Sequence, residues 1–326
     1  MTLLVRADPV SACAAPSDVL AIVSVSGGKD STASALCAIE VHGRDRCRFV
    51  FADVGNEHEL TLAYVRDYLP AIVGHIDTVR ADFSREIANK RTFVQTEWPA
   101  KGVPGEIVQR ALSVLHPTGV PFLDLCLWKG RFPSRKAQFC TQYLKRIPLD
   151  DYLLDRMAEG HEVESWRGVR RDESPSRRNT PDRERVAEGF EIVYPIASWT
   201  AQRTVEFVAG RGVRLNPLYM QGMARVGCMP CINAAKDELN EIARRFPQHI
   251  DRIREWEALV SLAAKRGWTT FFAGCRGENE SDAQIFLRLS IDARVRWAAT
   301  AHGGRQLDPA RLETPPACRS VYGLCD

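Results

Sequence analysis

The sequence lacks features that would place it at once in several protein classes. No apolar run reaches the roughly 20 residues of a membrane-spanning helix. The first residues include Asp8 and Pro9 where a signal peptide has a continuous apolar segment. The formal net charge is only +3, too small for the whole chain to bind nucleic acid through charge alone. There is no internal repeat and no low-complexity tract, so we expect a globular protein in the cytoplasm.

Cysteine, by contrast, is plentiful, with ten residues in the chain. Disulfides are short-lived in a reducing compartment, so grouped cysteines indicate metal or redox chemistry. Cys228 and Cys231 form a C-x2-C pair, and two more cysteines lie near the C-terminus. Such a pair, placed just before a predicted helix, lets two thiolates face one metal ion or cluster.

Apolar, β-branched segments alternate with helical ones along much of the chain. Helices separate short strands predicted at residues 18–26, 48–52, 75–79, 161–169 and 188–196. This alternation indicates an α/β fold with a parallel sheet. Residues 93–135 are rich in Gly and Pro and predict an irregular insertion with one helix near 105–115. From residue 198 onward the pattern is mostly helical.

The first predicted strand ends in Ser-Gly-Gly-Lys-Asp-Ser, and a helix follows. In an open parallel sheet this junction binds phosphate, because N–H groups at the helix start point outward and the helix dipole favours anions. Two glycines let the backbone approach a phosphate closely, the lysine adds positive charge and the serines add hydroxyl donors. The alternative is an ordinary tight turn with a helix cap. We predict a phosphate site formed by Ser26, Gly27, Gly28, Lys29, Asp30 and Ser31.

This loop is not a Walker A motif, since G-x4-G-K-[ST] is absent. It resembles the PP-loop of the N-type ATP pyrophosphatases and the adenine nucleotide alpha hydrolase-like proteins. The resemblance implies that the loop holds the terminal pyrophosphate of ATP. The segment that begins at Asp53 is similar to the DTG-x-E segment of the same family. A carboxylate at a strand end can hold Mg²⁺ or reach the nucleotide, whereas the alternative is that Asp53 only caps the next helix.

Residues 165–178, S-W-R-G-V-R-R-D-E-S-P-S-R-R, are rich in arginine. Arginine presents a planar fork that matches phosphate or sulfate oxygens, although the interspersed acidic residues also fit a solvated loop. The segment resembles the G-x-R-x-x-E-S-x-x-R motif of the phosphoadenosine phosphosulfate (PAPS) reductase family. The resemblance implies that the mouth of a nucleotide pocket is formed by Arg170, Glu173, Ser174 and Arg177.

Cys140 precedes T-x-x-L-K, as a cysteine does in PAPS reductase-like sequences. Iron–sulfur members of that family hold a [4Fe–4S] cluster with this cysteine and the C-x2-C pair, which implies metal ligands at Cys140, Cys228 and Cys231. The alternatives are zinc and a site of reduced thiols. Cluster-bearing reductases have a Cys-Cys pair where this chain has Cys140-Thr141, so a fourth ligand must come from elsewhere. Our first choice is Cys318, and the other candidates are Cys275 and Cys325.

The retained Lys29 and Asp30 favour ATP as the nucleotide, because PAPS and adenylyl sulfate reductases often lack them. The resemblance then implies a sulfurtransferase of the DNA phosphorothioation branch, in which Lys29 neutralises the leaving group and Asp30 or Asp53 positions Mg²⁺. The first alternative is a thioredoxin-dependent PAPS or adenylyl sulfate reductase that releases sulfite. There Cys325 is the candidate reacting thiol, by distant similarity to the reductases' C-terminal E-C-G-[IL]-H. The second alternative is a non-catalytic nucleotide-binding subunit with structural zinc.

The resemblance covers roughly residues 19–257 and implies a HUP-like, doubly wound fold with a five-stranded parallel sheet. We divide the chain into a flexible lead-in (1–17), an adenine-nucleotide-binding α/β domain (18–197) and a helical, cysteine-bearing region (198–326). Beyond the nucleotide, the implied partners are a cysteine desulfurase as sulfur donor or thioredoxin as reductant, and DNA or RNA as sulfur acceptor. No membrane partner is expected, and an oligomer is compatible with the sequence.

Overall fold

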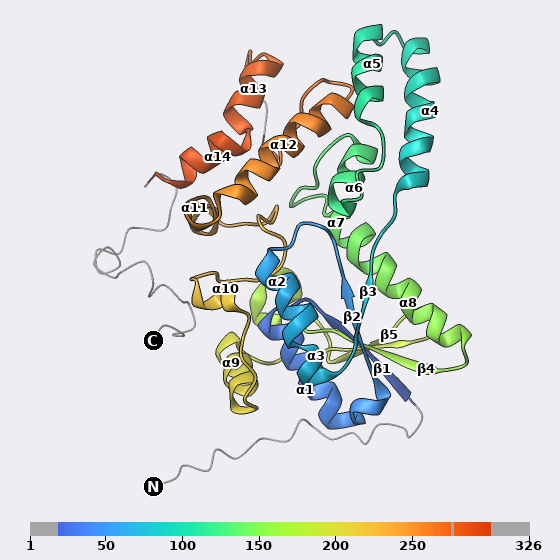
Figure 1. Ribbon diagram of the computed structural model, residues 1–326, viewed down its shortest axis with the longest axis vertical. Helices are drawn as coiled ribbons and strands as arrows, with labels where there is room; N and C mark the ends of the chain where they lie inside the picture. The colour runs from blue at the N-terminus through green and yellow to red at the C-terminus, as the bar shows by residue number, and fades with distance from the viewer. Residues whose placement is uncertain (1–18, 275–276, 301–326) are drawn as a thin grey trace. The chain divides into compact units, whose positions relative to one another are not determined.

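The computed structural model describes residues 19–274 and 277–300 (Figure 1). Its contacts divide the chain into two compact units, each assembled from separate stretches. Of the described residues, the first unit contains 19–52, 59–79 and 149–219. The second contains 53–58, 80–148, 220–274 and 277–300. The predicted lead-in lies outside the described residues, and the predicted boundary at residue 198 stays a prediction.

A six-stranded sheet forms the centre of the first unit, in the order β3-β2-β1-β4-β6-β5. Its strands are β1 Val19–Val25, β2 Cys47–Ala52, β3 Ile76–Val79, β4 Glu162–Trp166, β5 Arg183–Arg185 and β6 Glu191–Val193. Five strands pair in parallel, and β5 runs antiparallel to β6 at the edge. The predicted α/β fold is confirmed. The edge strand β5 was not predicted, because its Arg-Glu-Arg residues are exposed and carry no apolar pattern.

Helices cover both faces of this sheet. Those of the first unit are α1 Lys29–His42, α2 Glu59–Ala63, α3 Pro70–Val73, α8 Ile147–Ala158, α9 Ala201–Gly210 and α10 Pro217–Met220. Strand β1 turns alternate side chains to opposite faces. Ala21 and Val23 enter a core shared with α1 and α9, whereas Leu20 and Ile22 pack in a second core with α8. The burial of both faces explains why β1 reads as a continuous apolar run.

The second unit is helical throughout its described part. Its helices are α4 Ser84–Ala100, α5 Gly105–Val114, α6 Pro121–Lys129, α7 Phe139–Thr141, α11 Lys236–Arg245, α12 Pro247–Ala263, α13 Asp282–Leu289 and α14 Ile291–Ala298. The helix predicted near 105–115 is present as α5, but the rest of the segment predicted to be irregular, residues 93–135, also contains the end of α4 and the whole of α6. Its prolines mark helix boundaries: Pro99 lies in the last turn of α4, and Pro104 and Pro121 stand at helix starts.

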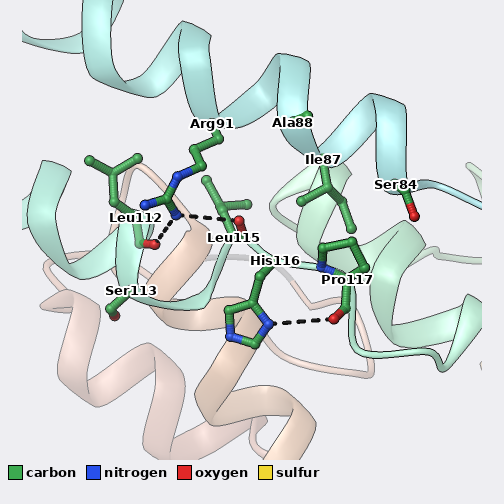
Figure 2. A pocket seen from close by; sticks show the side chains of 9 residues that line it. All are labelled: Ser84, Ile87, Ala88, Arg91, Leu112, Ser113, Leu115, His116 and Pro117. Atoms are coloured by element: carbon green, nitrogen blue, oxygen red, sulfur yellow. Dashed lines mark hydrogen bonds between the residues drawn. The ribbon is translucent and has the colours of Figure 1, made fainter.

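Helices α4 and α5 and the turn after α5 line a pocket of about 550 Å³ (Figure 2). Arg91 reaches from α4 to the carbonyl oxygens of Leu112 and Leu115, so it satisfies acceptors at the end of α5. The rest of the lining is largely apolar and contains none of the predicted site residues. Among the described residues, no helix combines the length and the apolarity that crossing a membrane requires.

Candidate functional site

The loop of residues 26–31 lies where β1 ends and α1 begins. Gly27 has φ +72°, a left-handed conformation that favours glycine, and a Cβ there would lie 3.0 Å from side-chain carbons of Thr61 and Val65. Gly28 is the N-cap of α1 and offers no side chain to cap the helix. A helix start without a side-chain cap is suited to receive an anion.

Ser31 holds the loop in shape from inside. Its hydroxyl donates to the carbonyl oxygen of Gly28 (3.0 Å) and accepts from the Ser26 N–H (3.0 Å). The Ser26 hydroxyl donates to the Ser31 hydroxyl oxygen (3.1 Å). The two serines were predicted as donors to a phosphate. In the structure their hydroxyl groups form hydrogen bonds within the loop and stabilise its curvature.

Three charged side chains meet at this loop. Asp30 places one carboxylate oxygen 2.9 Å from Lys29 Nζ and the other 2.6 Å from Arg170 Nε. Lys29 is only 5% exposed and Arg170 only 3% exposed. Arg170 also pairs with Asp172. The structure thus brings Arg170, 140 residues away in the sequence, to the loop, with Asp30 between two buried cations.

Sequence reasoning missed three neighbours of the loop. A Cβ at Gly168 would lie 2.5 Å from the Asp30 carbonyl oxygen, so the loop after β4 passes against the start of α1. Asn216 donates to the Gly27 carbonyl, and the Lys29 N–H donates to the Tyr219 hydroxyl. The motif that contains Gly168 was interpreted through its arginines alone. Only their placement reveals these contacts.

The rest of the predicted arginine segment lies in two short 3-10 turns, Arg171–Glu173 and Pro175–Arg177. Glu173 and Arg177 form an ion pair with each other. The hydroxyl of Ser174 lies 2.9 Å from that of Ser176. These three predicted residues therefore follow the buried Arg170 in the same loop but make their side-chain hydrogen bonds with one another or with their neighbours in that loop.

Asp53 follows β2 and belongs to the second unit. One of its carboxylate oxygens accepts from the Gly55 N–H (2.9 Å), and the other lies 3.5 Å from Arg80 Nε. The carboxylate thus closes the turn before α2, while its second oxygen remains partly solvated. The carboxylate does not cap α2, which begins only at Glu59, and its second oxygen, 3.5 Å from Arg80 Nε, is one that a cation can reach.

The second unit brings the predicted cysteines of the C-x2-C pair and Cys140 near one another. Cys140 lies on α7, and the chain at Cys228 forms an antiparallel bridge with Glu57. The pKa of the Cys228 thiol is raised to about 12, chiefly by burial; Lys145 opposes the rise, whereas Glu57 and the other two thiols contribute to it. Burial likewise raises the pKa of Cys140, with the Cys231 charge adding to the effect.

Lys145 is the counter-charge of this cysteine group. Its pKa is raised, chiefly by the charge of Cys228, with Glu57 adding to the effect and burial opposing it. A half-buried ammonium beside several thiols stabilises their deprotonated forms, which are the forms that bind metal. The predicted fourth ligands Cys318, Cys275 and Cys325 lie outside the described residues.

Cys37 and Cys47 lie in the first unit and are buried. Burial raises the pKa of each thiol to about 12. Cys126 is buried in α6 of the second unit. All three thiols are buried, and they offer matched controls for the cysteine group.

Comparison with known proteins adds to this geometry. The sequence profile described as Phosphoadenosine phosphosulfate reductase domain matches residues 126–234, which include the arginine segment and the three cysteines. The "Uncharacterized 37.8 kDa protein in gpa 5'region" of Escherichia phage 186 is 42% identical over 325 residues, or 94% of this chain and 96% of that protein. These two similarities together span nearly the whole chain.

Two further relatives match in part. Adenosine 5'-phosphosulfate reductase of Mycobacterium tuberculosis is 32% identical over 142 residues, or 43% of this chain and 52% of that protein. This chain therefore spans about half the length of the mycobacterial protein. The crystal structure of phosphoadenylyl-sulfate (PAPS) reductase from Candida auris, a phosphate complex, covers 65% of this chain and 82% of that chain, with 13% identity and a TM-score of 0.39.

Proposed function

Because the chain belongs to the PAPS reductase-like PP-loop family, we propose that it binds an adenine nucleotide at the 26–31 loop and uses it in sulfur chemistry. The observation that carries this proposal is the loop itself. It joins a buried strand to a helix with no side-chain cap and holds two buried cations beside that helix start. Anion binding at such a helix start needs no other special feature.

ATP is the nucleotide we favour. Lys29 lies in the loop itself, where it can neutralise the charge that develops on a departing pyrophosphate. Both carboxylate oxygens of Asp30 hold cations, so we assign Asp30 to positioning Lys29 and Arg170. Of the two predicted Mg²⁺ ligands, Asp53 then fits better, because one of its oxygens pairs only at 3.5 Å.

We favour an iron–sulfur cluster over zinc as the group that the cysteines hold. Among the described residues, the sulfurs of Cys140, Cys228 and Cys231 do not all lie within 4.8 Å of one another. A tetrahedral zinc ion with Zn–S bonds of about 2.3 Å would draw its thiolates to about 3.8 Å apart, whereas a cluster of several irons spreads its cysteines further. We propose that these three cysteines hold a cluster, which would supply electrons or sulfide when bound, while Lys145 offsets their charge.

A nucleotide screen of anaerobically purified protein tests this function. The protein is incubated separately with ATP, adenylyl sulfate and PAPS, and both pyrophosphate and sulfite are measured. Pyrophosphate from ATP without sulfite from either sulfonucleotide supports the ATP-dependent sulfurtransferase. A protein that binds none of the three nucleotides would contradict the proposal, and Lys29→Gln serves as the control for loop-dependent turnover.

A sulfonucleotide reductase is the second candidate. It is favoured by the 32% identity with the mycobacterial adenosine 5'-phosphosulfate reductase. In this reading the arginine segment binds the sulfate, and a thiolate attacks the sulfate sulfur and displaces the nucleotide. The thiosulfonate is then reduced by an external dithiol such as thioredoxin, which releases sulfite. Cys325 is the proposed nucleophile, so Cys325→Ser should abolish sulfite release in this case and leave ATP turnover unchanged in the first.

A further inference from the structure

The segment of residues 216–219 contacts the phosphate loop on both sides of Gly28. Asn216 Nδ2 donates to the carbonyl oxygen of Gly27 (3.2 Å). The N–H of Lys29 donates to the Tyr219 hydroxyl (3.1 Å). All of these residues belong to the first unit. The sequence separations of 189 and 190 residues show that tertiary structure, and not local chain geometry, creates these contacts.

Both side chains are fixed where they stand. Asn216 is 1% exposed and Tyr219 is 2% exposed, so water does not compete for their hydrogen bonds. The amide of Asn216 also donates to Thr61 Oγ1 (3.4 Å) and accepts from the Leu218 N–H (3.0 Å). Each end of the amide is therefore engaged, and its donor is held toward Gly27.

The direction of these two hydrogen bonds matters for an anion. A carbonyl oxygen that pointed at a bound phosphate would repel it, and Asn216 holds the Gly27 carbonyl in a fixed direction. Tyr219 takes the first N–H of α1, which leaves the next N–H groups, those of Asp30 and Ser31, for the phosphate. The loop after β4 passes close to the second of these, since a Cβ on Gly168 would lie 2.8 Å from Ser31 N.

We propose that Asn216 and Tyr219 are positioning residues that set the peptide orientation of the loop for a pyrophosphate group. This inference rests on the proposed function, because it assumes that the loop binds phosphate. It goes beyond a packing role, in which a phenylalanine would serve as well as Tyr219.

Two nearly isosteric substitutions separate these roles. Tyr219→Phe keeps the ring and removes the hydrogen-bond acceptor. Asn216→Asp keeps the shape and replaces the donor by a carboxylate that repels the Gly27 carbonyl. Tyr152→Phe is the matched control, because the Tyr152 hydroxyl donates instead to Asp77 (2.6 Å) in the same unit.

The experiment is calorimetric titration of the full-length chain with inorganic pyrophosphate, ATP and AMP, alongside circular dichroism to confirm folding. We expect both variants to lose about tenfold or more in affinity for pyrophosphate and ATP, since a buried hydrogen bond that orients the binding amides is lost. AMP, which lacks the pyrophosphate, should change by less than about threefold. Tyr152→Phe should bind all three ligands as the wild type does.

The outcomes separate this inference from the proposed function. Wild-type affinity for pyrophosphate in folded Tyr219→Phe overturns the positioning role and leaves the proposed function standing. A wild-type chain that binds neither ATP nor pyrophosphate overturns the proposed function, and the positioning role falls with it. If Asn216→Asp does not fold, Tyr219→Phe alone decides the question.

Discussion

At Gly168 the loop after β4 passes so close to the start of α1 that it leaves no room for a methyl group. A Cβ there would lie 2.5 Å from the Asp30 carbonyl oxygen and 2.8 Å from Ser31 N. Overpacking of this kind typically costs about 1–3 kcal/mol, because the backbone must shift. We predict that Gly168→Ala lowers ATP affinity by about tenfold or more, as measured by calorimetric titration.

Gly210 provides the control for this substitution. It lies in α9 of the same unit, and a Cβ there would meet nothing within 4 Å. Gly210→Ala should therefore bind ATP as the wild type does. Equal affinities in the two variants would contradict a close packing between the β4 loop and the phosphate loop.

Asp30 is the second residue whose replacement gives a clear result. Its carboxylate lies between Lys29 and Arg170, which are almost completely buried. Loss of a partner leaves a buried charge uncompensated, at a cost of roughly 3 kcal/mol. We predict that Asp30→Asn lowers the free energy of unfolding by about this amount in urea titrations, without changing the Mg²⁺ concentration at which ATP turnover is half-maximal.

The comparison variant is Asp172→Asn. Asp172 pairs with the same arginine, but its side chain is 43% exposed and solvent screens the pair. Its loss should cost less than about 1 kcal/mol. A large shift of the Mg²⁺ dependence in Asp30→Asn alone would show instead that Asp30 coordinates the metal.

At the scale of elements, the cysteine group consists of Cys140 on α7 and of Cys228 and Cys231 in the segment before α11. We predict that Cys140→Ser and Cys228→Ser each lose most of the iron that the anaerobically purified wild type carries, expected at about four atoms per chain. Cys47→Ala, a buried cysteine of the other unit, should keep it. Iron and acid-labile sulfide analysis and visible absorbance measure the effect. Zinc in place of iron in the wild type would refute the cluster.

The Glu257 side chain, on α12, forms hydrogen bonds with two neighbouring segments of the second unit. It accepts from the N–H groups of Phe271 (2.7 Å) and Ile291 (2.9 Å). Burial raises its pKa from 4.5 to about 7, although the hydrogen bond from Ile291 opposes the shift. Between these values the folded state keeps a proton that the unfolded state has lost. Stability should therefore fall as pH rises through this window, by roughly 3 kcal/mol in total.

Glu257→Gln removes this titration while keeping one acceptor oxygen. We predict that its free energy of unfolding, relative to wild type, rises between about pH 4.5 and pH 7 and is constant above that range. Urea unfolding across this range measures the difference. Glu255→Gln changes an exposed glutamate of the same helix and should show no such trend. An equal pH trend in both variants would contradict the assignment.

Elements with strong local signals could be predicted from the sequence. The buried β-branched runs of β1 and β2 and the uninterrupted helix α1 were predicted correctly, because burial on both sheet faces leaves an apolar run. The insertion was misread because its prolines and glycines were counted as breaks within it, whereas they stand between regular helices. The mostly helical pattern from residue 198 did not reveal the boundary at Pro247, where α12 begins directly after α11.

At the scale of the whole molecule, the limit of sequence reasoning is contact between distant segments. The phosphate loop was recognised because its six residues are contiguous. Arg170 was assigned to the nucleotide site through a motif, and the structure brings it to Asp30. Asn216, Tyr219 and Gly168 were missed, because the contacts they make span well over one hundred residues and leave no periodic signal in the chain.

Amide hydrogen exchange of the full-length chain tests most directly whether the loop binds the phosphates of an adenine nucleotide. Exchange is followed by mass spectrometry in peptides that contain residues 26–32, with and without ATP, inorganic pyrophosphate or adenosine. We expect ATP and pyrophosphate to slow exchange in these peptides by about tenfold or more, and adenosine to have little effect. If ATP binds with measurable affinity but exchange at this loop stays unchanged, the nucleotide lies elsewhere and the proposed site is wrong.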